Sequence, residues 1–94
     1  MRVYDVVLSR RYKTAYKRLS RHKDFDNNTL ERVINALARK ELLASKYRDH
    51  QLSGELKDFR ECHIKNDMLL LYQYHDTLLI LLLVDIGTHE SLFR

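Results

Sequence analysis

The sequence predicts one α+β domain over residues 1–94, in which two N-terminal helices pack on a mostly antiparallel four-stranded sheet. Apolar residues recur at helical spacing in the first half of the chain, and in short runs or in alternation in the second half. Neither half contains a proline. A chain of 94 residues can bury one modest core and not two. The expected element order is therefore β-α-α-β-β-β.

The first strand and the first helix are expected to follow one another directly. Val3 to Leu8 is short, apolar and rich in β-branched residues, which is typical of a strand. Ser9 is a suitable N-cap for the helix after it. Four residues then fall on one apolar face of that helix: Tyr12, Ala15, Tyr16 and Leu19.

The second helix is expected to begin near Asn28, because Asn28 and Glu31 resemble a capping box. The segment from Lys23 to Asn27 is short and polar, so the two helices should form an antiparallel pair. The apolar face of the second helix comprises Leu30, Val33, Ile34, Leu37 and Ala38, and Leu42 is a candidate extension of it.

Alternation in the segment from Phe59 to Lys65 predicts a strand with two different faces. Cys62 and Ile64 should face the core of the domain. His63 should then point to the opposite, concave face of the sheet.

Two further strands are expected after this one. A turn from Lys65 to Asp67 should lead into a strand over Met68 to Tyr74. A turn from His75 to Thr77 should lead into Leu78 to Val84, whose unbroken aliphatic run is typical of a central strand buried on both faces. Gly87 permits a sharp exit from that strand, so the residues from Thr88 to Arg94 should form a tail.

Charge and cysteine content narrow the class of function. Lys and Arg outnumber Asp and Glu by four, and a pI of about 9.3 favours polyanionic partners such as nucleic acid or acidic proteins. The single cysteine, Cys62, cannot form an internal disulfide, which fits a reducing compartment. The longest apolar run, Leu78 to Val84, is too short to cross a bilayer, and no signal peptide is evident. We therefore expect a cytoplasmic protein with no membrane partner.

Three histidines and one aspartate occupy expected strand ends and loops in the second half of the chain: His50, His63, Asp67 and His89. Histidine can both accept and donate a proton near neutral pH, so this group predicts acid–base chemistry on a phosphate-bearing substrate. Residue types alone leave two other interpretations open. The histidines could be unrelated surface residues, or the group could hold a transition metal, although no compact His–His or Cys–Cys spacing supports a metal site.

The remaining histidines and the cysteine receive no catalytic role. Cys62 lies within an expected strand, where a cysteine is more often a small core residue than a nucleophile. His22 and His75 are expected in solvent, one beside the basic helix and one in a turn.

The face of the first helix opposite its apolar residues is strongly basic. Few acidic residues are placed to pair with these cations, so we favour a platform for a phosphate backbone over a merely solvated face. The basic residues are Arg10, Arg11, Lys13, Lys17, Arg18 and Arg21.

Several motifs are in register with a known family. They are Tyr47-Arg48-Asp49-His50, Gly54, Phe59-Arg60-Glu61-Cys62-His63-Ile64, Asp67, Leu70, Tyr72, Gly87-Thr88-His89 and Leu92-Phe93. With these residues the chain resembles the YafQ-type toxins of the RelE superfamily. The resemblance covers nearly the whole chain and is most specific from Tyr47 to Phe93.

The resemblance implies the toxin of a type II toxin–antitoxin pair, an endoribonuclease that cuts mRNA in the A site of the 70S ribosome without a metal ion or another cofactor. It also implies a cognate antitoxin as partner, with operator DNA contacted only through that antitoxin. Arg60 is expected to join the basic residues of the first helix as an RNA or ribosome contact. The family's active-site residues fall at His50, His63, Asp67, His89 and Phe93.

The chain departs from the family pattern at a few positions. Gln51 and Asn66 stand where prolines are frequent, and Met68 replaces an aromatic residue of some relatives. Asp85 stands where several relatives have arginine, which puts one phosphate contact in doubt and places a carboxylate near a site that should prefer anions.

Cleavage of RNA through its own 2′-hydroxyl needs a base for that proton, an acid for the departing 5′-oxygen, and positive charge or hydrogen-bond donors around the phosphorus. We assign His89 as the acid and either His50 or His63 as the base. Asp67 would orient a histidine or share the base role, and Phe93 would stack or pack against a nucleobase. Coupled groups cannot be apportioned from sequence, so the base stays open.

Other functions remain as alternatives on this scaffold. ParE-type relatives share the fold but poison DNA gyrase, which needs no proton-transfer set. A metal-dependent hydrolase using the same cluster would lose its activity to a strong chelator. A degenerate toxin would bind its antitoxin and cut nothing.

Overall fold

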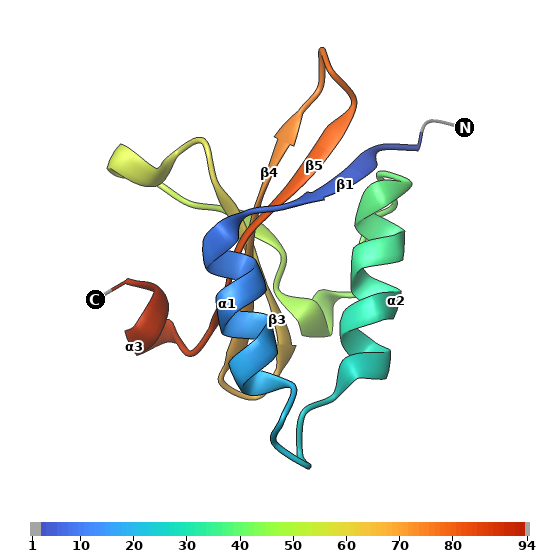
Figure 1. Ribbon diagram of the computed structural model, residues 1–94. Coiled ribbons are helices and arrows are strands. Elements are labelled where there is room, and N and C mark those ends of the chain that lie inside the picture. Colours follow the sequence, from blue (N-terminus) through green and yellow to red (C-terminus); the bar gives the residue numbers. More distant parts are fainter. Residues whose placement is uncertain (1–2, 94) are drawn as a thin grey trace.

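Five strands form one mixed sheet, and two helices, α1 and α2, cover one of its faces (Figure 1). The computed structural model describes residues 3–93 of the chain. The strands are β1 (Asp5–Leu8), β2 (His50–Gln51), β3 (Arg60–Lys65), β4 (Met68–His75) and β5 (Ile80–Gly87). The helices are α1 (Arg10–Leu19), α2 (Asn27–Ala38) and α3 (His89–Leu92), and two 3₁₀-helices, η1 (Ser45–Tyr47) and η2 (Gly54–Leu56), flank β2.

The predicted α+β class is confirmed, with one correction to the sheet. The strand order is β1-β5-β4-β3-β2, in which β1 runs parallel to β5 and all other neighbours are antiparallel. The predicted count of four strands is one too low. The additional strand, β2, has only two residues, so no alternation of apolar and polar positions could reveal it.

The two predicted helices are present and run antiparallel (Figure 1). Ser9 caps α1 as predicted, because its hydroxyl accepts a hydrogen bond from the backbone of Tyr12. The cap of α2 is Asp26 and not Asn28, and its carboxylate accepts bonds from both the backbone N–H and the hydroxyl of Thr29. Leu42 does not extend the apolar face, since α2 ends at Ala38 and Leu42 is 99% exposed.

The last predicted strand and the predicted tail both need correction. The strand β5 begins two residues later than expected, because Leu78 is 67% exposed in the turn after β4. A continuous run of leucines hides the start of a strand from periodicity alone. The strand is also not buried on both faces throughout, since Leu82 and Val84 are only partly covered. The expected tail contains α3, while Arg94 lies outside the described residues.

The sheet has two apolar faces of different size. The face covered by α1 and α2 carries the main core, which includes Cys62 and Ile64 as predicted. The other face carries a smaller cluster in which Leu69 and Leu71 of β4 meet Leu92 of α3. Because side chains alternate along β3, His63 projects on the side of this smaller cluster, away from the main core. Within residues 3–93, the helices are too short and too polar to cross a membrane.

The buried tyrosine Tyr12 makes the free energy of unfolding sensitive to alkaline pH. Burial, together with the neighbouring Tyr16, raises the pKa of Tyr12 to about 12. The unfolded chain ionises this phenol near pH 10, so its contribution to stability is present below pH 10 and is lost as the pH rises towards 12. Between pH 9 and pH 11, we expect the free energy of unfolding of Tyr12→Phe to fall by about 1 kcal/mol less than that of wild type. Urea unfolding at both pH values measures the two changes. Equal losses in both proteins would contradict this assignment.

Candidate active site

An open hollow on the smaller face of the sheet brings together residues that are far apart in the sequence. It has a volume of about 280 Å³, and its polar lining includes His50 from β2, Glu61 from β3 and His89 from α3. Leu52 and Phe93 are among its apolar lining residues. Figure 1 shows η2 and α3 projecting from the sheet on the side away from α2, and these two segments border the hollow. Three of the five predicted site residues therefore share one cavity.

The close approach at Gly87 lets α3 fold back against the sheet. A Cβ atom at this position would lie 2.4 Å from Oγ of Ser91, so a larger residue would require the hydroxyl of Ser91 to move. Thr88 then caps α3 by accepting a hydrogen bond from the backbone of Ser91. Leu92 anchors the helix in the smaller apolar cluster. His89 thus stands on a short helix held at both ends.

His89 and Phe93 form a ring pair within α3 and its C-cap. Their ring centroids are 5.0 Å apart, as expected for residues four apart on a helix. Phe93 also packs against the smaller apolar cluster, so its ring restricts where the imidazole of His89 can lie.

Glu61 is the centre of the site, and the sequence did not single it out as a site residue. It is only 5% exposed, yet its Oε2 atom lies 3.7 Å from Nε2 of His50 and 3.9 Å from Nε2 of His63. A buried carboxylate is costly unless it has a partner, so a position between two imidazoles indicates a functional role. The alternation along β3 carried the signal, because it places Glu61 on the same face as His63.

The ring of His50 is held in one tautomer. Its Nδ1 atom lies 2.6 Å from the carbonyl oxygen of Arg48, and a carbonyl can only accept a hydrogen bond, so Nδ1 carries the proton. In the neutral ring, Nε2 is then the free lone pair, and it faces Glu61. This arrangement suits a group that accepts a proton through Nε2.

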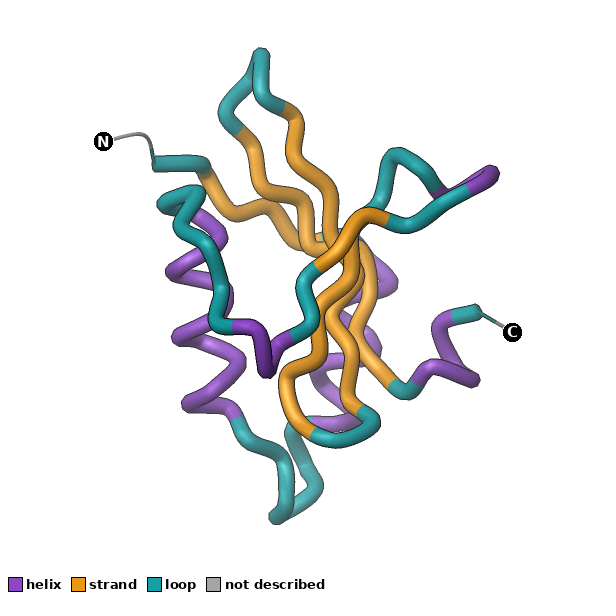
Figure 2. Tube along the Cα trace, turned by 180° about the vertical axis from the view of Figure 1, so that it is seen from behind, coloured by secondary structure: helices purple, strands orange, loops and turns teal. Residues whose placement is uncertain are grey.

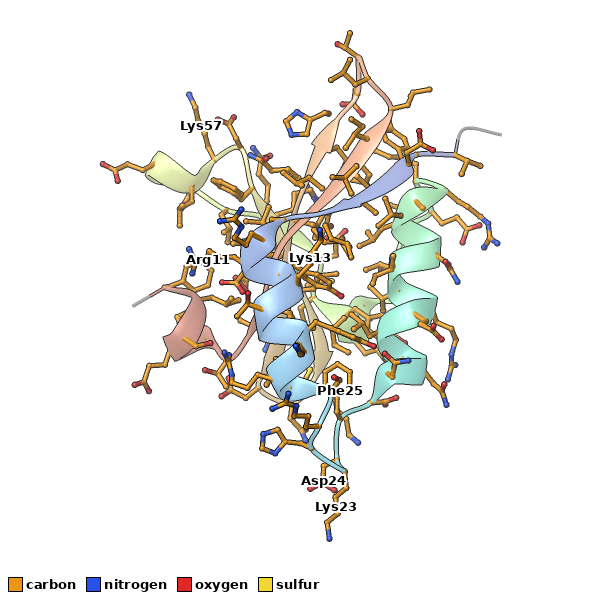
Figure 3. All side chains as sticks on the ribbon, in the orientation of Figure 1. Arg11, Lys13, Lys23, Asp24, Phe25 and Lys57 are labelled. Carbon is orange, nitrogen blue, oxygen red and sulfur yellow. The ribbon has the colours of Figure 1, made fainter. Side chains whose placement is uncertain are left out.

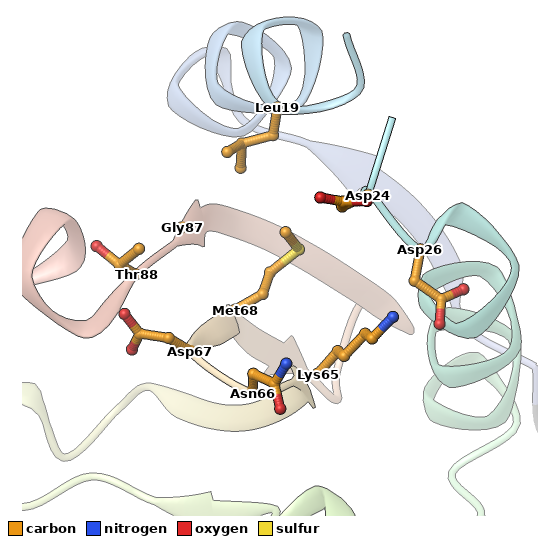
Figure 4. A pocket seen from close by; sticks show the side chains of 9 residues that line it. All are labelled: Leu19, Asp24, Asp26, Lys65, Asn66, Asp67, Met68, Gly87 and Thr88. Atoms are coloured by element: carbon orange, nitrogen blue, oxygen red, sulfur yellow. The ribbon is translucent and has the colours of Figure 1, made fainter. Parts of the chain in front are cut away.

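Asp67 does not lie in the hollow that contains His50 and His89. It follows β3 in a tight turn and lines a separate cavity of about 420 Å³ (Figure 4). Thr88, the cap of α3, lines the same cavity. Asp67 is therefore placed beside the start of the helix that carries His89, and not beside the histidine rings.

The structure divides the predicted basic residues in and after α1 into two groups, and Arg21 follows the end of the helix at Leu19. Arg10, Arg11 and Arg18 line a crevice of about 440 Å³ between α1, the end of β5 and α3. The other predicted contacts, Lys13, Lys17 and Arg21, do not line it. Figure 3 shows Arg11 and Lys13 on different sides of α1.

The negative charge of Asp85 is compensated by an ion pair that could not be predicted from the sequence. Its carboxylate pairs with the guanidinium of Arg11 at 2.8 Å and also accepts a hydrogen bond from the backbone of Ile86. The Asp85 charge is thus paired with Arg11 at the floor of the crevice.

Arg60 is oriented away from the histidine hollow. It shares the face of Cys62 and Ile64, and its guanidinium donates to the hydroxyl of Tyr72 and to the carboxylate of Asp49. The hydroxyl of Tyr72 donates to the same carboxylate. This network holds Asp49, the residue before His50, against the centre of the sheet. The role of Arg60 is therefore structural.

Removal of the carboxylate at the centre of this network should loosen the segment that leads into β2. We expect Asp49→Asn to lower the free energy of unfolding by roughly 1–2 kcal/mol, because an amide nitrogen cannot accept the bond from Arg60. Urea unfolding checks this result, with the exposed Asp58→Asn as the matched control. A variant as stable as that control would show that the network contributes nothing.

Two chemical alternatives find no support in the geometry. Burial raises the pKa of the Cys62 thiol, which keeps it protonated and unreactive in the core. Among residues 3–93, the His, Cys, Asp and Glu side chains do not converge in groups of three that could hold a metal ion.

Known proteins of similar sequence share one description. Residues 4–94 match the family "Bacterial toxin of type II toxin-antitoxin system, YafQ". The mRNA interferase toxin YafQ of Escherichia coli K12 is 36% identical over 91 residues, which cover 96% of this chain and 91% of that protein. A YafQ protein of Haemophilus influenzae is 46% identical over 42 residues, which cover 45% of this chain and 41% of that protein.

Solved structures with the same fold have similar descriptions. A metal-bound toxin from Helicobacter pylori has a TM-score of 0.88 and 42% sequence identity, over 96% of this chain and 99% of that chain. The DinJ–YafQ complex of Escherichia coli contains a chain with a TM-score of 0.83 and 27% identity, over 97% of this chain and 99% of that chain.

Proposed function

The chain belongs to the YafQ family of toxins of bacterial type II toxin–antitoxin systems, and from this premise we propose that it is a metal-independent endoribonuclease that cuts mRNA on the ribosome. One observation carries the proposal. The buried carboxylate of Glu61 lies between two imidazoles, in a hollow that also contains His89. A gyrase inhibitor on the same fold would have no use for such a proton-transfer set.

Among the candidates that the sequence left open, we propose His50 as the base. In the proposed reaction, Nε2 of His50 takes the proton of the 2′-hydroxyl, and that oxygen attacks the adjacent phosphorus. The Glu61 carboxylate, 3.7 Å from that same nitrogen, stabilises the imidazolium that forms. The carbonyl of Arg48 accepts the hydrogen bond from Nδ1, which is the position that the aspartate occupies in a Ser-His-Asp triad. His63, on the other side of Glu61, completes the polar environment of the phosphate.

His89 donates a proton to the 5′-oxygen as the bond from phosphorus to that oxygen breaks. The products are a 2′,3′-cyclic phosphate and a free 5′-hydroxyl, so atoms and protons balance without another reactant. Phe93 packs against a nucleobase and holds the ring of His89. Asp67 acts indirectly, by fixing the start of α3 next to Thr88.

The basic residues of α1 supply affinity for the phosphate backbone of RNA. Arg10 and Arg18 line the crevice beside α3 and are the primary contacts in this proposal, whereas Arg11 in the same crevice is paired with Asp85. Lys13, Lys17 and Arg21 would contact the ribosome more broadly. Arg60 contributes through its hold on Asp49 and Tyr72.

A cognate antitoxin is the second proposed partner, and operator DNA would be contacted only through it. The solved DinJ–YafQ complexes support an antitoxin partner for this fold. The proposal places the protein in the cytoplasm, where ribosomes and antitoxin are found.

The proposed function is tested with purified protein and 70S ribosomes programmed with mRNA. We expect cuts in the A-site codon, mapped by primer extension, that persist with a chelator selective for transition metals, which leaves ribosomal Mg²⁺ in place. Loss of cutting with the chelator would assign the site to a metal-dependent hydrolase. Absence of cutting together with inhibition of DNA supercoiling would assign the protein to the gyrase inhibitors.

A further inference from the structure

We propose that a second, cationic groove beside the histidine hollow binds the phosphodiester backbone of mRNA where the strand continues beyond the cleavage site. The groove lies between η1 and the open edge of β3, and its cations are Lys46, Arg48 and Lys65. This inference rests on the proposed function, because it extends the path of the same substrate.

The groove exists because β3 has only a short neighbour on one side. The strand β2 pairs with Arg60 and Glu61 alone, so within the described part of the chain the outer edge of β3 from Cys62 to Lys65 has no adjacent strand. The 3₁₀-helix η1 lies beside this edge, as Figure 2 shows. The space between them has a volume of about 450 Å³.

The three cations of the groove form no ion pair within 4 Å among the described residues, although Lys46 lies 5.2 Å from the ring centroid of Tyr47. Hydrogen bonds from Thr29 lower the pKa of Asp26, and the charge of Lys65 helps to lower it further. Arg11 in the crevice beside α3, in contrast, is already neutralised by Asp85. Asp26 is the acidic residue of the groove, and its carboxylate is committed to Thr29 at the cap of α2.

The groove is continuous with the proposed active site. His63 lines the groove, and its Nε2 atom is 3.9 Å from Glu61, which lines the hollow. Arg48 has a left-handed backbone with φ of 49°, an uncommon conformation for arginine, and its carbonyl holds the ring of His50. A strand that leaves the hollow past Glu61 and His63 therefore meets Arg48 and its neighbouring cations.

This continuity favours RNA over an acidic peptide as the ligand. An acidic peptide would match the charges of the groove equally well, but it would have no reason to bind against His63, whose ring lies 3.9 Å from Glu61 of the catalytic hollow. A nucleic-acid strand must continue on both sides of the bond that is cut, and successive phosphates suit a row of cations.

The test compares two triple variants of equal charge in the ribosome cleavage assay. Lys46→Gln/Arg48→Gln/Lys65→Gln removes the groove cations, and Lys23→Gln/Arg39→Gln/Lys57→Gln removes two lysines and one arginine that do not line the groove. Figure 3 shows Lys23 and Lys57 far from one another on the surface. We expect the groove variant to raise KM about 10-fold or more with kcat nearly unchanged, and to weaken the salt dependence of kcat/KM by about 0.7 per lost phosphate contact. The control variant should resemble wild type.

Shortened messages identify which RNA occupies the groove. One truncated mRNA is cut back on the side of the cleavage site that faces the groove. With this message, we expect wild type and the groove variant to have the same KM. A KM penalty that persists with messages shortened on either side would assign the groove to ribosomal RNA and overturn the inference.

Three further outcomes have distinct meanings. If wild type and the groove variant cut mRNA equally well, the proposed binding role of the groove is overturned and the proposed function is not. Weaker antitoxin binding by calorimetry, with normal cleavage, assigns the groove to an acidic peptide and also overturns the inference. Absence of cleavage by wild type on any message overturns the proposed function itself.

Discussion

His89→Gln is expected to lower kcat for mRNA cleavage by about 10³-fold, because a positioned general acid contributes on the order of 10²–10⁴-fold. Glutamine preserves much of the size of the imidazole but cannot give a proton to the departing 5′-oxygen. The side chain of His89 is exposed, and α3 is anchored by Leu92, so the free energy of unfolding should change by less than about 0.5 kcal/mol. Single-turnover cleavage and urea unfolding measure the two effects separately.

A substrate with a better leaving group tests the acid role directly. When sulfur replaces the 5′-bridging oxygen at the cut, departure needs no proton, so the deficit of His89→Gln should shrink to about 10-fold or less. His22→Gln and His75→Gln serve as controls, since neither residue lines the hollow, and both should cut at the wild-type rate. An equal deficit on both substrates would exclude His89 as the acid.

The periodic parts of the fold could be predicted from the sequence, because they depend on local spacing. The apolar face of α1, the Ser9 cap and the alternation around Cys62 were all readable in this way. The end of α2 was not, because Leu42 continues the helical spacing after the chain has left the helix at Ala38. Periodicity shows which residues would share a face if the helix continued, and not where it stops.

The parts of the site that depend on long-range contacts could not be predicted. The short helix α3 is stabilised by Leu92 against strand β4, a contact that no local pattern shows. The pairing of Arg11 with Asp85 joins two segments that only the fold brings together. The histidines could be identified from the sequence by their residue type. The position of the Glu61 carboxylate between them could not, because it depends on the register of β2 against β3.

Glu61→Gln should lower activity without lowering stability. We expect cleavage to fall by about 10²-fold, because the amide cannot stabilise the imidazolium that forms when His50 takes the proton. We expect the free energy of unfolding to stay equal or to rise by roughly 1 kcal/mol, because a neutral amide is cheaper to bury than a carboxylate. Such a trade-off is typical of a group retained for function and not for folding.

Two matched variants separate this role from a structural one. Glu55→Gln removes an exposed carboxylate near η2 and should change neither quantity. Glu61→Asp keeps the charge but shortens the side chain, so it should recover part of the activity that Glu61→Gln loses. A purely structural Glu61 would give the reverse pattern, with both substitutions lowering the urea midpoint and cleavage falling only in proportion to the unfolded fraction. Within residues 3–93, the ion pairs of Glu61 are those with the rings of His50 and His63, so the stability measurement distinguishes the two roles.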